Sequence, residues 1–124
     1  SVLTVYPPVQ SGGDLNELGL TALATSGDFD LLITGDMSGS TERKLAETYP
    51  LPDVEVLVVS HHGSRYSSDI RFLKAVTPEA AVISVGDNSY GHPSEETVQR
   101  LLAVGAEIWR TDRQGNIRIT VNGG

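Results

Sequence analysis

Two adjacent histidines, His61 and His62, follow a mostly apolar run that is typical of a buried strand, with only Ser60 between them and the run. This run covers residues 54–59, and a second one, residues 31–34, is followed after a single glycine by Asp36. The ends of core strands hold side chains rigidly, and imidazole and carboxylate groups are good ligands for zinc and manganese. The two runs therefore predict a metal site at one edge of an α/β sheet.

Groups that could bind an anionic substrate lie close to the histidine pair. Ser64 supplies a hydroxyl and Arg65 a guanidinium, and both can donate hydrogen bonds to an anionic oxygen. His92 lies in a later loop, immediately before a proline. Simpler interpretations stand beside these: Arg65 as an exposed side chain, His92 as the residue that begins a helix, and the histidine pair as one packed and one solvated ring.

The composition narrows the range of possible functions and of possible metal ligands. The chain has 124 residues, enough for one compact domain, and no apolar stretch approaches the length of a membrane-spanning helix, so we expect a soluble chain. It contains no cysteine, so any metal must be held by oxygen and imidazole ligands. A net charge of -7 disfavours passive coating of nucleic acid and leaves open an enzyme whose metal ions supply positive charge.

The hydrophobic periodicity predicts strands that alternate with helices, hence an α/β fold. Turn residues and serine caps, Ser38 or Ser40 for the first helix and Ser94 for the last, mark the boundaries. The expected strands cover residues 2–6, 18–24, 29–34, 54–59 and 80–85, the helices cover about 40–49, 68–76 and 95–104, and residues 107–111 and 116–121 form a terminal hairpin around 112–115.

Four polar segments follow predicted strands, which is where open α/β sheets usually place their ligands. They are Gly35-Asp36, His61-His62, residues 88–92 and Thr111-Asp112. Asp112 is most simply a residue of the hairpin turn. Trp109 is most simply a core or sheet-edge residue rather than a platform on which a base stacks.

The motifs occur in one order along the chain. They are Asn16, LLITGD (31–36), SHHGS (60–64), ISVG (83–86), YGHPS (90–94), and RTD (110–112) with Gly115. Each motif alone is common, but the ordered set, from about residue 14 to residue 120, resembles the C-terminal metallo-β-lactamase-like domain of the ComEC family of competence proteins.

The resemblance implies the C-terminal part of an αββα sandwich, with a mixed sheet, helices on one face, and a terminal hairpin. Residues 1–124 would form a single unit of it. In such a domain Asp36 would bridge two divalent cations, zinc or manganese, and His62 would ligate the second. His61 would be an alternative ligand or a substrate contact, and His92 would lie on the substrate side, so that Asp36, His61 and His92 are the expected catalytic residues.

The resemblance also implies a role. ComEC-like proteins import DNA through a membrane channel, and this domain, on the extracytoplasmic face of a bacterial membrane protein, is thought to degrade the strand that does not enter. Ser64 and Arg65, with His92, would then contact phosphate. The family takes its first ligands from a His-x-His-x-Asp-His or His-x-Ser-x-x-Asp-His motif, and none precedes Asp36. We therefore expect the N-terminal metal-ligand half to be absent and the isolated chain to be inactive.

Two other functions remain open. The chain could be a non-catalytic module of the same fold that serves assembly or DNA docking, with the histidines as structural residues. A receiver-like regulator is a weaker alternative, because the chain lacks an acidic pair near its start and a lysine after a late strand. Half of a sandwich exposes an apolar sheet face, so self-association is also expected.

Overall fold

The computed structural model describes residues 2–6, 21–35, 38–85 and 92–120, and of residues 61 and 62 it describes the backbone alone. Strands and helices alternate along most of this chain, which confirms the expected α/β class. The elements are β1 (Val2–Tyr6), β2 (Thr21–Ser26), β3 (Phe29–Ile33), α1 (Gly39–Thr48), β4 (Val56–Val58), the 3-10 helix η2 (Ser60–Gly63), α2 (Ile70–Val76), β5 (Ala80–Ile83), α3 (Glu95–Ala103), β6 (Glu107–Arg110) and α4 (Thr111–Gln114).

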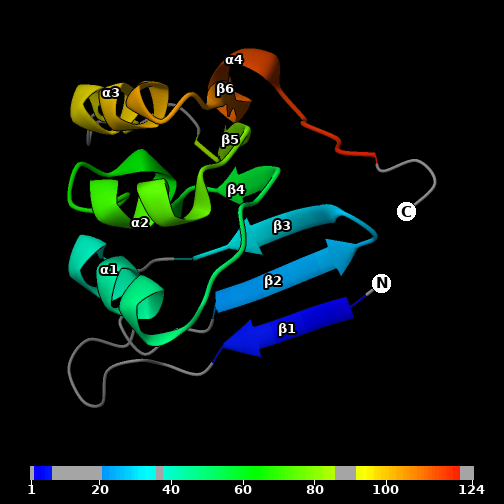
Figure 1. Ribbon diagram of the computed structural model, residues 1–124. Helices are drawn as coiled ribbons and strands as arrows, with labels where there is room; N and C mark the ends of the chain where they lie inside the picture. Colours follow the sequence, from blue (N-terminus) through cyan, green and yellow to red (C-terminus); the bar gives the residue numbers. More distant parts are fainter. Residues whose placement is uncertain (1, 7–20, 36–37, 86–91, 121–124) are drawn as a thin grey trace.

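The strands of the described residues form one six-stranded mixed sheet in the order β1-β2-β3-β4-β5-β6 (Figure 1). β2 pairs antiparallel with both β1 and β3, and β3, β4, β5 and β6 are parallel. Leu32, Leu57, Ala81 and Ile108 are paired in register across the four parallel strands, so they share one face. Parallel alignment places the carboxyl ends of these four strands along a single edge.

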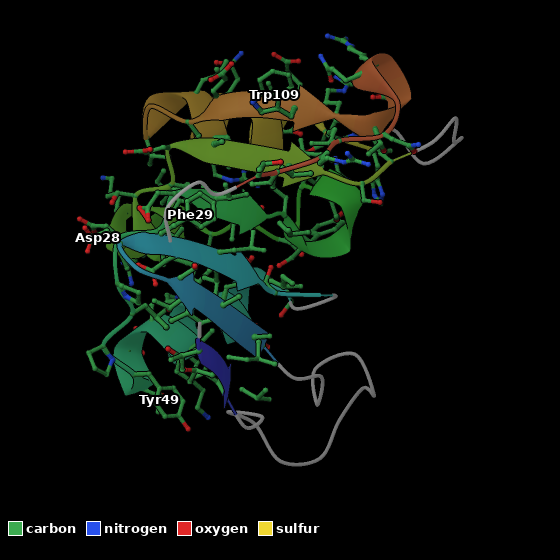
Figure 2. All side chains as sticks on the ribbon, turned by 90° about the vertical axis from the view of Figure 1, so that its right-hand side faces the viewer. Asp28, Phe29, Tyr49 and Trp109 are labelled. Carbon is green, nitrogen blue, oxygen red and sulfur yellow. The ribbon has the colours of Figure 1, made fainter. Side chains whose placement is uncertain are left out.

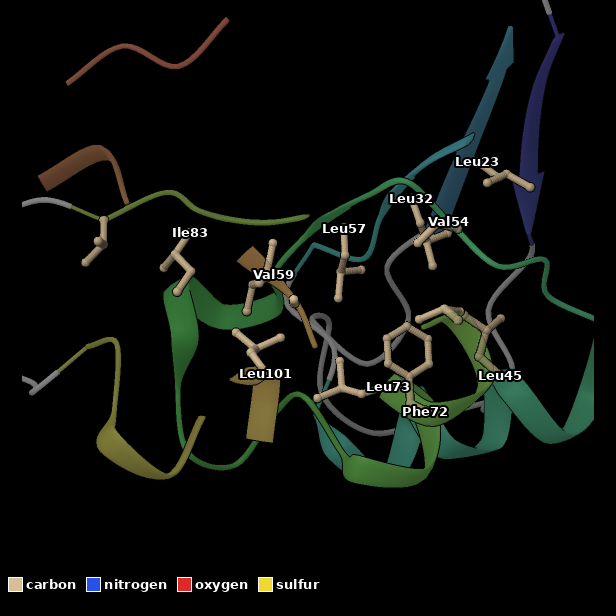
Figure 3. Packing of buried hydrophobic residues seen from close by; sticks show 14 residues of the cluster. Leu23, Leu32, Leu45, Val54, Leu57, Val59, Phe72, Leu73, Ile83 and Leu101 are labelled. Carbon is tan, nitrogen blue, oxygen red and sulfur yellow. The ribbon is translucent and has the colours of Figure 1, made fainter. Parts of the chain in front are cut away.

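Helices α1, α2 and α3 cover one face of the sheet, as expected (Figure 1). The core lies between the two layers, where Phe72 and Leu73 of α2 lie close to Leu57, and all three are completely or almost completely buried (Figure 3). Each such side chain stabilises the fold by about 1.5–3 kcal/mol. Ser38 and Ser94 cap α1 and α3 with their hydroxyls, as the sequence predicts.

The opposite face of the sheet is also apolar. Leu31 follows the alternation of β3 onto this face, and Val82 does the same on β5. Figure 2 views the sheet from this side, and Trp109 lies on the edge strand β6 with 39% of its surface exposed. Trp109 is thus a sheet-edge residue.

The expected terminal hairpin is wrong. After β6 the chain forms α4, and residues 116–120 form no strand. The Gln114 side chain accepts a hydrogen bond from the backbone N–H of Arg110, and Asp112 lies in the first turn of α4 instead of in a hairpin turn. Ile117 and Ile119, like Asn116 and Arg118, line a pocket over the open sheet face with Val82 and Trp109, so this segment lies over the sheet without pairing with a strand.

Candidate functional site

The carboxyl edge of the parallel strands brings together the segments that the sequence singles out. Thr34, which follows β3, contacts the hydroxyl of Ser60, which follows β4, and also donates a hydrogen bond to Val58 O at 3.1 Å. At the other end of the edge, Thr111 bonds through its hydroxyl to both the N–H and the carbonyl of Val85, each at 2.7 Å. Side-chain bonds therefore join the neighbouring strand ends.

The residues that come shortly before the two proposed metal ligands in the sequence are in contact with each other. Asp36 lies outside the described residues, and so do the side chains of His61 and His62, whose backbone forms η2. Thr34 precedes Asp36 by two positions and Ser60 directly precedes His61, and these two hydroxyls are in contact. The expectation that Asp36 and His62 share a metal stays a prediction that this arrangement of neighbours favours.

Gly63 joins the histidine segment to the residues around His92. Its carbonyl accepts a hydrogen bond from Ser94 N–H at 2.9 Å. Its φ is +85°, and a Cβ at this position would lie 2.5 Å from Pro93 Cβ and 2.9 Å from Pro93 Cα. Only glycine permits both this conformation and this approach.

Ser64, Arg65 and His92 line one pocket of about 390 Å³, together with Tyr66, Ser94, Glu95 and Glu96. The structure thus gathers the three predicted substrate contacts. Arg65 is exposed, its guanidinium donates a hydrogen bond to Tyr66 Oη at 2.8 Å, and it lies 4.9 Å from the centre of that ring. Because the pocket combines donor groups with two carboxylates, an anion alone would meet repulsion there, whereas an anion with bound cations would not.

Glu42, which the sequence analysis did not single out, is buried beside this site with 1% of its surface exposed. Its Oε2 accepts from Ser60 Oγ at 2.9 Å and its Oε1 from Asp69 N–H at 3.0 Å. Burial raises the pKa of Glu42 from 4.5 to about 7, although these hydrogen bonds act in the opposite direction. A sequence signal existed: position 42 lies three residues before Leu45 and so continues the buried stripe of α1.

Arg100 is the second residue that sequence reasoning missed. From α3 it donates hydrogen bonds to three carbonyl oxygens of the segment that follows η2, those of Arg65, Ser67 and Ser68, at 2.9–3.0 Å. Thr97 adds a hydrogen bond to Ser64 O at 2.8 Å. Helix α3 therefore holds the segment that carries Ser64 and Arg65, and no sequence motif announces this role.

Arg110 and Asp112 form an ion pair after β6, elsewhere at this edge. Asp112 forms a salt bridge with Arg110 at 2.7 Å, and this hydrogen-bonded partner lowers the pKa of the Asp112 carboxyl. Within the part of the chain that the structure describes, no three histidine, aspartate or glutamate side chains gather as they would around a metal ion. Asp36, His61 and His62 fall outside that set.

Fold and edge together define an α/β protein whose candidate polar groups lie at the carboxyl ends of parallel strands. The chain is homologous to one part of the competence proteins of the ComEC family, which confirms the resemblance noted in the sequence. It is 30% identical over 113 residues to ComE operon protein 3 of Bacillus subtilis (strain 168), a match that covers 90% of this chain and 15% of that protein.

Other relatives give the same picture. Competence protein ComA of Neisseria gonorrhoeae is 37% identical over 120 residues, covering 95% of this chain and 17% of that protein. Recombination protein 2 of Haemophilus influenzae is 31% identical over 105 residues, covering 84% of this chain and 13% of that protein. No family model matches the chain. Among the described residues, no helix has the length and apolar character needed to span a membrane.

Proposed function

We propose that this chain supplies part of a metal-dependent phosphodiesterase that cleaves DNA in a ComEC-like DNA uptake protein and degrades the strand that is not taken up. One observation carries the proposal: the residues that lead to Asp36 and to His61-His62 touch at one sheet edge, through Thr34 and Ser60. Ser64 and Arg65, which line the pocket and would contact phosphate, follow His62 after a single glycine.

The donor set fits a divalent cation. Asp36 would bridge two zinc or manganese ions and His62 would ligate one of them, and carboxylate with imidazole suits both metals. When bound, such a pair of ions supplies a nucleophilic hydroxide and polarises the phosphoryl oxygen. His61 or His92 would orient the scissile phosphate or protonate the leaving oxygen, and Ser64 and Arg65 would hold it.

Two donors from this chain are too few for a tight dinuclear site, so a further set of ligands is part of the proposal. The apolar second face of the sheet supports a metallo-β-lactamase-like sandwich, because parallel strands with two apolar faces are normally covered on both sides. Leu31, Val56 and Val82 lie on that face. A second sheet over these residues, from the same protein on the extracytoplasmic side of its membrane, would bring the missing ligands.

The test uses the chain extended by its natural upstream sequence, with Mn²⁺ or Zn²⁺ and either single- or double-stranded DNA. Metal-dependent cleavage should be lost in Asp36→Ala and in His62→Ala. Asp28→Ala is the matched control, because Asp28 is exposed and precedes β3, at the opposite edge of the sheet (Figure 2). Cleavage that survives both site changes would remove the proposed centre.

A non-catalytic module for assembly or DNA docking is the second candidate. Glu95 and Glu96 in the pocket favour the assembly role over DNA docking, since these carboxylates would repel a phosphate that carries no cation. An extended chain that neither cleaves nor binds DNA with or without metal would support assembly, whereas metal-independent DNA binding without cleavage would support docking.

A further inference from the structure

Glu42 connects three parts of the fold that meet beneath the candidate site. It lies on the first turn of α1, and one carboxylate oxygen reaches Ser60 at the end of β4. The other oxygen reaches the backbone N–H of Asp69, the residue that caps α2. Ser60 in turn contacts Thr34 at the end of β3. The single carboxyl group thus links α1 and α2 to both strand ends from which the predicted ligands emerge.

The hydrogens in this chain of contacts can be counted. With Glu42 ionised, Ser60 donates to Glu42, and the one hydroxyl hydrogen of Thr34 can serve either Ser60 Oγ or Val58 O, but not both. With Glu42 protonated, all three contacts can be satisfied at once: Glu42 donates to Ser60, Ser60 to Thr34, and Thr34 to Val58. The only charged side chain that acts on Glu42 among the described residues is Asp69, which also favours the neutral acid.

We propose that Glu42 is a positioning residue, which as a neutral acid holds the ends of β3 and β4 at the spacing that the Asp36 and His62 ligands require. The inference rests on the proposed function for its metal readout. Its structural content, that Glu42 orders the segment from Ser60 to Ser64, is independent of any metal. Removal of groups that support metal ligands commonly lowers metal affinity by about 10–100-fold.

Two substitutions at one position separate positioning from burial. Gln in Glu42→Gln can donate to Ser60 and accept from Asp69, so it imitates the neutral acid. Leu in Glu42→Leu has similar volume but forms neither bond. Glu47→Leu is the control, because Glu47 is exposed on the same helix. Should Glu42→Leu fail to fold, Thr34→Val removes the Thr34 hydroxyl from this series of hydrogen bonds at nearly constant side-chain volume.

The first measurement is Mn²⁺ affinity by calorimetry, with the chain extended by its natural upstream sequence. We expect Glu42→Leu and Thr34→Val to bind about 10-fold more weakly or worse, and Glu42→Gln and Glu47→Leu to remain within about twofold of the unsubstituted protein. Affinity unchanged in a folded Glu42→Leu, or lowered equally in Glu42→Gln, would overturn the inference.

The second measurement is amide hydrogen exchange in the 124-residue chain without metal. Exchange from residues 60–64 should accelerate at least about 10-fold in Glu42→Leu and stay unchanged in Glu42→Gln, with α3 as internal reference. If the unsubstituted extended protein binds no Mn²⁺, the proposed function fails, and this exchange experiment alone decides on Glu42. Equal exchange rates of residues 60–64 in Glu42→Leu and Glu42→Gln would refute the positioning role of Glu42.

Discussion

Replacement of Gly63 by alanine should destabilise the junction between the histidine segment and the start of α3. The φ of +85° costs a residue with a Cβ about 1–2 kcal/mol. The added carbon would also lie 2.5 Å from Pro93 Cβ and 2.9 Å from Pro93 Cα, and relief of such an overlap costs about 1–3 kcal/mol more. The sum, about 2–5 kcal/mol, is a large share of the 5–15 kcal/mol typical of a domain.

Gly105 provides a matched control. Its φ is +83°, nearly the same as that of Gly63, but an added Cβ would have no heavy atom within 4 Å. Gly105→Ala therefore carries only the conformational cost. Urea unfolding followed by circular dichroism should place Gly63→Ala about 1–3 kcal/mol below Gly105→Ala. Equal losses in the two variants would refute the close approach between Gly63 and Pro93, and with it the joining of the His92 segment to the histidine pair.

Three further changes test other parts of the fold. The pKa of Glu42 is raised from 4.5 to about 7, so between these pH values the folded state holds a proton on Glu42 that the unfolded state has released. The protein should therefore lose about 3 kcal/mol of stability relative to Glu42→Gln as the pH rises from about 4.5 to above 7. Denaturant titrations at several pH values measure this, and a stability difference between the two proteins that does not change with pH would contradict it. Arg100→Lys should cost about 2 kcal/mol, because one ammonium group cannot reach three carbonyls in fixed directions; urea unfolding of Arg100→Lys beside Arg71→Lys, an exposed control on α2, measures it. Leu3→Lys, on the open sheet face, should shift sedimentation of the isolated chain from oligomer to monomer, and a monomer before the change would argue against self-association.

The carboxyl ends of β4 and β5 could be located from the sequence to within about two residues, because each strand is an apolar run with polar residues or glycine after it. Residues 54–59 and 80–85 are short, mostly apolar runs followed by Ser60 and Gly86, and such runs match strands buried on both faces. Four parallel strands in consecutive order then leave one edge for all the polar segments that follow them. Ser64, Arg65 and His92 meet in one pocket for this reason.

Periodicity places Glu42 in the buried stripe of α1 but could not identify its partners, and it gives no signal for Arg100, because the partners of both charged residues lie far along the chain. Glu42 bonds to Ser60 and Asp69, 18 and 27 positions away. Arg100 bonds to backbone carbonyls, which have no sequence signature, 32–35 positions away. A charged residue in an apolar stripe indicates a buried partner without naming it.

The terminal hairpin failed for a related reason, and the failure bears on function. Alternating apolar residues are compatible with a strand that pairs in a sheet and also with an irregular segment that lies over a sheet face. Ile117 and Ile119 belong to a segment of the second kind. Thr111, directly after β6, bonds through its hydroxyl to Val85, and β6 is the last strand of the sheet among the described residues. The C-terminal segment lies over Val82 and Trp109 on the second, apolar face of the sheet, and this apolar face is the physical basis of the proposal that an opposing layer supplies further metal ligands.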